Sequence, residues 1–169
     1  MADFNDHIDQ AKKNIEFLQG INANLNDFWD WQVTCCFYIA VHLVNAHLAK
    51  KANLHYRSHE EVANAINPYN VLSITKLAEP VYLCYEKLRG LSRRSRYLTH
   101  EKAKQKDDEF YHPTVDKHLA KALYKLDEIM IYFEQEYKIS FDVIEIDCIE
   151  IKTASLKYFK YKMKGAVSA

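Results

Sequence analysis

Residues 27–50 read DFWDWQVTCCFYIAVHLVNAHLAK, and this stretch is apolar on nearly every side when it is drawn as a helix. A helix that is hydrophobic all round is typical of the centre of a protein rather than of its surface. We therefore predict that residues 27–50 form a central helix and that the rest of the chain packs around it.

The few polar side chains of this helix follow one narrow line, which we call the polar seam. Its members stand at positions i, i+4, i+8 and i+11, beside Trp31 and Cys35, and they are Thr34, Tyr38, His42 and Asn45. Because the helix has no extended hydrophilic face, we expect the seam and Trp31 to be mostly buried. Their polar groups would then need hydrogen-bond partners, and the sequence leaves open whether these are one another, a neighbouring helix or a ligand.

Length and composition favour one helical core. The chain has 169 residues, of which 49% are hydrophobic, so it can bury a substantial core as a single unit. The chain has only three Gly and three Pro, the residues that most often mark turns, and this favours long helices over many short strands. The 23 basic and 23 acidic residues cancel, so any attraction to nucleic acid or to an anionic membrane must be local.

The cysteines and the N-terminus bear on location. Cys35, Cys36, Cys84 and Cys148 lack CxxC spacing and are interpreted as reduced packing residues, which suggests a cytoplasmic protein. The polar start MADFNDHIDQ is unlike a signal peptide, and no apolar run reaches the roughly 20 residues of a membrane span. We expect no membrane association.

Amphipathic patterns predict further helices on both sides of the central one. A first helix begins after Asp3 as N-cap and ends at Gly20, and a short helix opens with the capping box of Ser58 and Glu61. Apolar stripes predict two more long helices, over residues 80–99 and 115–137. The prediction is an all-α, antiparallel bundle of four long helices with one or two short ones, over residues 1–138.

Residues 139–169 change character and are interpreted as a C-terminal appendage. FDVIEIDCIEI alternates apolar and acidic residues, and LKYFKYKM is a basic, aromatic counterpart. Opposite charges across two strands would favour a β-hairpin, and a terminal helix is the alternative.

A basic face is predicted on the helix over residues 80–99. At about 100° per residue, Arg89, Arg93, Arg96 and His100 lie on one side, opposite a leucine stripe. Tyr82 and Tyr85 extend this side. Arginines with tyrosines suit phosphate contacts and base stacking, although a charged helix face is more often simply solvated.

The histidines do not form a convincing metal site in the sequence. His55 and His59 have i, i+4 spacing at the start of the short helix, but no third ligand is evident, and a zinc site needs three or four. We predict structural or capping roles for both, a core role for His42, and neither a metal nor another cofactor.

Two passages resemble the HEPN superfamily (higher eukaryotes and prokaryotes nucleotide-binding), all-helical domains that include metal-independent endoribonucleases. They are WQVTCCFYIAVHLVNAHLAKKANLHYRSHEE at residues 31–61, similar to the bacterial and archaeal branch, and the SRRSRY block at residues 92–97. The ribonuclease members carry Arg, four to six residues, then His. Arg94 and His100 meet that spacing with five residues between them, and Arg93 meets it with six.

The resemblance implies an RNA- or nucleotide-associated protein of toxin or defence type that acts as a homodimer. His100 would then be the acid or base at the ribose 2′-OH or the leaving oxygen, and Arg94 would steady the scissile phosphate. The alternative is a non-catalytic module that binds a protein partner or another copy of itself.

Overall fold

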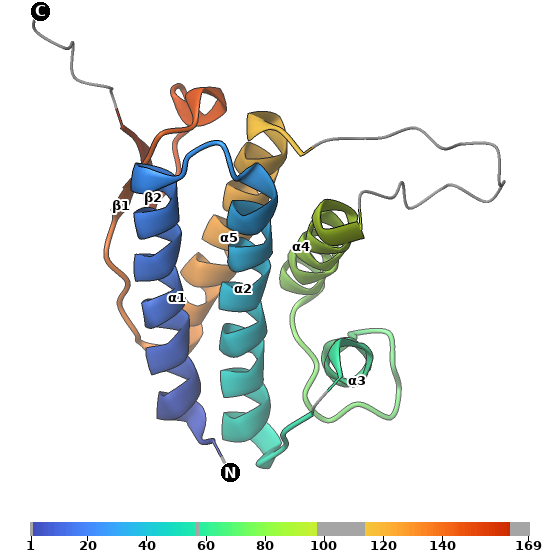
Figure 1. Cartoon of the computed structure of the whole chain (residues 1–169). Coiled ribbons are helices and arrows are strands. Elements are labelled where there is room, and N and C mark those ends of the chain that lie inside the picture. Colours follow the sequence, from blue (N-terminus) through green and yellow to red (C-terminus); the bar gives the residue numbers. More distant parts are fainter. Residues whose placement is uncertain (1, 57, 98–113, 163–169) are drawn as a thin grey trace, which may run out of the picture.

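The computed structural model describes residues 2–56, 58–97 and 114–162, and most of this part is helical (Figure 1). Its elements, in chain order, are α1 (Phe4–Asn24), α2 (Trp29–Ala52), α3 (His59–Ile66), α4 (Glu79–Tyr97), α5 (Asp116–Tyr137), β1 (Ile144–Ile146), the 3-10 helix η1 (Ile149–Ile151) and β2 (Phe159–Tyr161). The predicted bundle of four long helices and one short helix is confirmed over the described residues.

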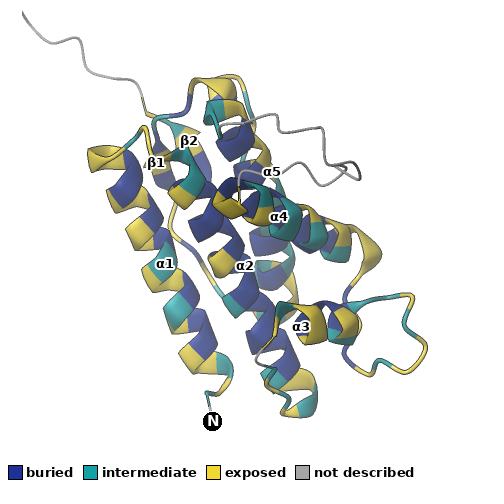
Figure 2. Cartoon of the chain, turned by 45° about the vertical axis from the view of Figure 1, so that its right-hand side comes forward, coloured by how far each residue is buried: buried dark blue, intermediate teal, exposed yellow. Residues whose placement is uncertain are grey.

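Helix α2 is the centre of the bundle. It packs against α1, α3, α4 and α5, and it is buried along most of its length (Figure 2). By length and composition alone α2 could cross a membrane, but 83% of its most apolar stretch is buried inside the protein. The apolar surface of α2 is therefore used by the core, as the sequence predicted.

The predicted N-cap at Asp3 and the predicted capping box of Ser58 and Glu61 are both present, and Asp3 also forms a capping box with Asp6. The Asp3 carboxylate accepts the backbone N–H of Asp6 at 2.9 Å, and the Asp6 carboxylate accepts that of Asp3 at 2.8 Å. Ser58 and Glu61 make the same reciprocal pair at the start of α3. Each box satisfies backbone donors that have no partner within the helix, so the starts of α1 and α3 are set by local sequence.

The predicted end of the first helix at Gly20 is wrong, because α1 continues to Asn24. The two residues after Gly20, Ile21 and Asn22, are buried, and the Asn22 amide donates to the Gln32 side chain of α2 at 2.8 Å. Contacts with α2 therefore outweigh the small cost of a glycine inside a helix.

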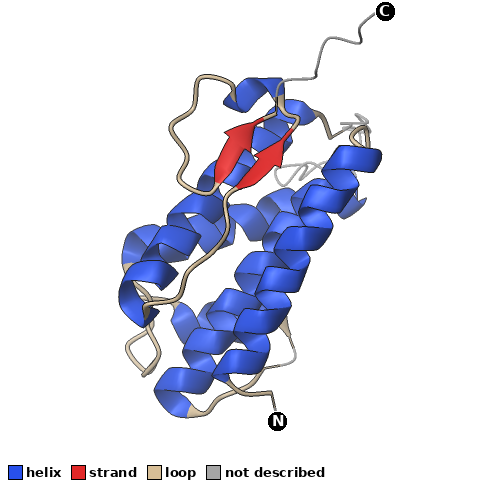
Figure 3. Ribbon diagram, turned by 90° about the vertical axis from the view of Figure 1, so that its left-hand side faces the viewer, coloured by secondary structure: helices blue, strands red, loops and turns tan. Residues whose placement is uncertain are grey.

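The predicted β-hairpin is also wrong, since β1 and β2 run parallel, with Ile144 opposite Phe159 and Ile146 opposite Tyr161 (Figure 3). The alternative of a terminal helix is not found in residues 139–162 beyond the short η1. The pairing of opposite charges does occur, because Glu145 and Lys160 face each other in the register.

Tertiary contacts explain the parallel direction. The buried carboxylate of Asp127 on α5 accepts the backbone N–H groups of Lys157 and Tyr158, at 3.0 and 2.8 Å. The Tyr158 carbonyl in turn accepts the N–H of Ile144 at 2.9 Å. Because Ile144 and Phe159 are buried in the same core as the helices, the strand pair packs on the bundle.

The predicted burial of the polar seam and Trp31 holds for three of the five side chains and is wrong for Tyr38 and Trp31. Thr34 and Asn45 are buried and His42 is half-buried, but Tyr38 is 38% exposed and Trp31 59% exposed. Asn14 and Phe17 of α1 and this side of α2 line one hollow. The seam therefore borders a surface hollow.

Candidate nucleic-acid interface

A groove of about 570 Å³ lies between α3 and α4, and we call it the α3–α4 groove. Its walls are basic and aromatic on the α4 side, and a histidine stands on the α3 side. The lining residues are His59, Glu60, Ala63, Asn64, Tyr82, Arg89, Arg93, Arg96 and Tyr97.

The buried stripe of α4 determines where the arginines point. Val81, Leu88 and Leu91 turn into the core, and residues 89, 93 and 96 then lie on the side of the helix next to α3. Arg89 is paired with Glu86 at 2.9 Å, and Arg96 lies over the Tyr97 ring at 5.5 Å. Within the described residues, neither an ion pair nor a side-chain hydrogen bond engages the exposed Arg93.

The α3 capping box places His59 in the first helical turn, at the edge of the groove. Its ring packs edge-on against Phe37 at 5.1 Å and against Tyr38 at 5.9 Å. Burial and the charges of Arg96 and Arg89 lower the pKa of His59, so its imidazole is neutral at pH 7. The groove thus holds three guanidinium groups and a neutral imidazole.

The sequence predicted some of the residues that line the groove and not others. Tyr82 and the three arginines line the groove as predicted, but Tyr85 is completely buried, so its ring is inaccessible for base stacking. Tyr97, which is 63% exposed, lines the groove instead. His59 was missed because only the packing of α3 beside α4 brings it to the arginines.

Arg94 lies on another side of α4 from the groove arginines. Its charge, after burial, lowers the pKa of His118 on α5, and its Nε atom is buried without a hydrogen-bond partner among the described residues. His100 falls outside the described residues. The pairing of Arg94 with His100 therefore stays a prediction.

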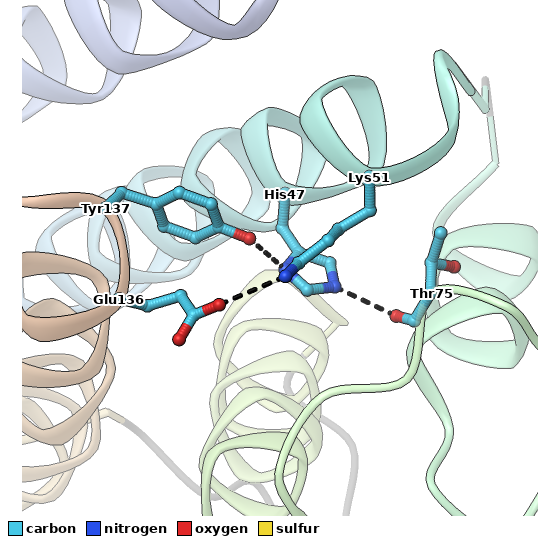
Figure 4. Close-up of polar contacts among 5 residues, drawn as sticks. All are labelled: His47, Lys51, Thr75, Glu136 and Tyr137. Atoms are coloured by element: carbon cyan, nitrogen blue, oxygen red, sulfur yellow. Dashed lines mark hydrogen bonds and ion pairs between the residues drawn. The ribbon is translucent and has the colours of Figure 1, made fainter.

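His47, unlike half-buried His59, is fully buried and serves the fold (Figure 4). Its Nε2 atom lies 3.0 Å from the Thr75 carbonyl, which can only accept, so Nε2 carries the proton. Its Nδ1 atom then accepts from the Tyr137 hydroxyl at 2.6 Å. His47 thus joins α2, α5 and the segment before α4, and its hydrogen bonds are used within the protein.

His7 and His42 form a third histidine contact, with their Nδ1 atoms 3.3 Å apart, and His55 stacks on His7. Burial lowers the pKa of both His7 and His42, and each is lowered further by a neighbouring histidine. Among the described residues, neither these side chains nor any other group of three His, Cys, Asp or Glu has the arrangement of a metal site.

Comparison with known proteins adds no relative. No protein-family model matches the chain, and neither a curated protein nor a solved structure matches it.

Proposed function

We propose that the protein binds RNA or a nucleotide in the α3–α4 groove. The observation that carries this proposal is the convergence of Arg89, Arg93 and Arg96 on one groove that also exposes Tyr97. It is also the function that the resemblance to the HEPN superfamily implies.

The chemistry of the lining suits a phosphate chain with attached bases. The arginine side chain presents several hydrogen-bond donors in a planar fork that matches phosphate oxygens. Three arginines line the groove, and Glu60 is the one carboxylate among the described lining residues. Tyrosine rings provide stacking surfaces that accept any base. Because the whole chain has zero net charge, attraction to a polyanion must come from a local cluster of positive charges.

The test is fluorescence anisotropy with a labelled 12-nucleotide oligouridine, in EDTA and at several salt concentrations. We expect Arg93→Ala to weaken binding about tenfold at low salt and to reduce the salt slope by about 0.7, since one phosphate contact is lost. Tyr97→Ala should also weaken binding, because base stacking is worth about 1–3 kcal/mol per base.

Lys87→Ala is the control, because it removes an exposed positive charge of the same helix that does not line the groove. It should bind RNA like the wild type, and circular dichroism melting should confirm that both variants fold. Equal affinities of Arg93→Ala and the wild type, or equal losses in Arg93→Ala and Lys87→Ala, would reject the groove as the binding site.

A second candidate function is self-association, and the segment between α3 and α4 favours it. Val71, Leu72 and Ile74 are 88, 90 and 80% exposed, which is unusual for three aliphatic side chains in four residues. We propose a second copy as the partner, because a two-fold interface brings the same patch of both copies together.

The free, buried cysteines also support the proposed cytoplasmic location.

Light scattering at micromolar concentration tests this second candidate. The wild type should have twice the chain mass of 19.9 kDa, and Leu72→Asp should have the monomer mass. Leu83→Asp, at a half-exposed leucine on α4, is the control and should remain dimeric. A monomeric wild type would contradict the candidate.

A further inference from the structure

A second hollow lies between α1 and α2, and we call it the α1–α2 slot. Its volume is about 270 Å³, less than half that of the α3–α4 groove. It is lined by Asn14, Phe17, Trp31, Thr34, Cys35, Tyr38 and His42. Most of the polar seam of α2 thus lines this slot.

Three aromatic rings surround the slot. Phe17 comes from α1, and Trp31 and Tyr38 come from α2, and their exposed fractions are 61, 59 and 38%. Exposed aromatic side chains that gather at one hollow mark a binding site more often than isolated ones do. Rings from two helices can hold a flat ring system by stacking and edge contacts.

The slot also contains an unused polar group. Thr34 is only 4% exposed, and its hydroxyl has no hydrogen-bond partner among the described residues. An unpaired buried hydroxyl costs free energy, which a ligand with one suitable polar atom would recover. The Gln10 side-chain amide donates to the Asn14 side-chain oxygen Oδ1 at 3.0 Å, so the Asn14 NH₂ group can serve as a donor at the rim.

The lining bears no formal charge. Asp, Glu, Lys and Arg are absent from the described residues that line the slot, and burial and the neighbouring His7 keep His42 neutral at pH 7 by lowering its pKa. A charged ligand would lose hydration there without gaining a counter-charge. The volume lies just below the range of about 300–1,000 Å³ that drug-sized ligands occupy, which favours one or two fused rings.

We propose that the α1–α2 slot binds a neutral, planar heteroaromatic small molecule, held between Trp31, Phe17 and Tyr38 and hydrogen-bonded to the Thr34 hydroxyl. This site is separate from the α3–α4 groove, and its occupant needs no phosphate. The proposal therefore does not depend on whether the groove binds RNA.

Three probes of similar size and different charge test the proposal in a ¹H–¹⁵N NMR titration. They are indole-3-acetamide, which is neutral, indole-3-acetate, which is an anion, and tryptamine, which is a cation. We expect saturable shifts at residues 14–17 and 31–42 with the neutral amide, and affinities at least tenfold weaker for the two charged probes.

Variants locate the site. Trp31→Ala should abolish the saturable shifts, and Thr34→Val, which keeps the shape and removes the hydroxyl, should weaken the amide about five- to tenfold. Tyr97→Ala removes an exposed aromatic ring outside the slot and should bind like the wild type.

Two results would overturn the proposal. One is unchanged binding of the amide by Trp31→Ala, which would make the interaction adventitious. The other is a shift of the same resonances on dilution of the ligand-free protein, which would show that a second copy covers the slot.

Discussion

The Tyr38 ring stands edge-on to the His59 ring, with 5.9 Å between the ring centroids, and the two side chains belong to different hollows. Tyr38 lines the α1–α2 slot, and His59 lines the α3–α4 groove. Because α2 lies between α1 and the pair formed by α3 and α4, this contact links the two sites through one layer of side chains (Figure 1).

Removal of the Tyr38 ring should raise the pKa of His59. Burial is the main reason that this pKa is low, and Tyr38→Ala would admit water to the imidazole. The pKa should move up toward the ordinary value of about 6.5 without reaching it, since Arg96 and Arg89 remain. An NMR titration of the His59 ring proton measures this pKa. The Trp31 side chain does not touch His59, so Trp31→Ala should leave the pKa of His59 unchanged.

His47→Phe should lower the free energy of unfolding by about 2–4 kcal/mol, because the Tyr137 hydroxyl and the Thr75 carbonyl each lose a partner near the core. Urea unfolding measures the change. Lys51→Ala is the neighbouring control, since the Lys51–Glu136 pair is 45 and 40% exposed, and it should cost less than about 1 kcal/mol. Similar losses in both variants would contradict the role given to His47 (Figure 4).

Asp127→Ala should release the C-terminal strand pair from the bundle. The change leaves the backbone N–H groups of Lys157 and Tyr158 without their acceptor, at a cost of about 2–4 kcal/mol. Hydrogen exchange at the Ile144 amide should become faster, because that amide donates to the Tyr158 carbonyl. Glu134→Ala removes the ion pair with Lys157 and an interaction with the Tyr158 side chain but leaves both backbone N–H groups bonded to Asp127, so it should change the exchange rate much less.

Stability should fall as the pH drops below about 6.5, the ordinary pKa of histidine. Burial lowers the pKa of His7 and His42 in the folded protein, so the unfolded chain binds protons first. The stability due to neutral His7 and His42 is complete above the unfolded pKa and is lost as the pH falls through the folded pKa. The slope is at most about 1.4 kcal/mol per pH unit for each histidine.

Denaturant unfolding between pH 5 and 8 measures this dependence. The pKa is lowered in the folded protein for five of the described histidines, His7, His42, His47, His59 and His118, so His7→Phe should flatten the curve only in part. Asp3 and Asp6 also oppose part of the His7 effect by raising its pKa. A wild-type curve that stays level from pH 8 to pH 5 would disagree with neutral His7 and His42.

If the RNA that binds is also cleaved, the resemblance predicts that His100→Ala and Arg94→Ala lose about 10² or more in rate, in EDTA and with the fold intact. The groove geometry makes His59→Ala the informative companion, since neutral His59 stands beside three arginines. Activity retained by His100→Ala and lost by His59→Ala would reassign the proton transfer. Equal activity in all variants would reject catalysis by these residues.

The sequence by itself determined the features that depend on neighbours along the chain. The apolar run of α2 predicted the central helix, the N-cap residue Asp3 predicted the start of α1, and the pair of Ser58 and Glu61 predicted the start of α3. Helical periodicity placed Arg89, Arg93 and Arg96 on one side of α4. Each of these depends on local geometry, which the chain carries wherever it packs.

Only the tertiary structure decided which faces meet. The strand pair is parallel because Asp127 on α5 holds the chain before β2, and Tyr85 is buried because the core extends further around α4 than its leucine stripe indicated. Trp31 and Tyr38 are exposed because α1 does not cover that side of α2. His59 joins the arginines only where α3 lies beside α4, and such contacts depend on helix packing rather than on spacing along the chain.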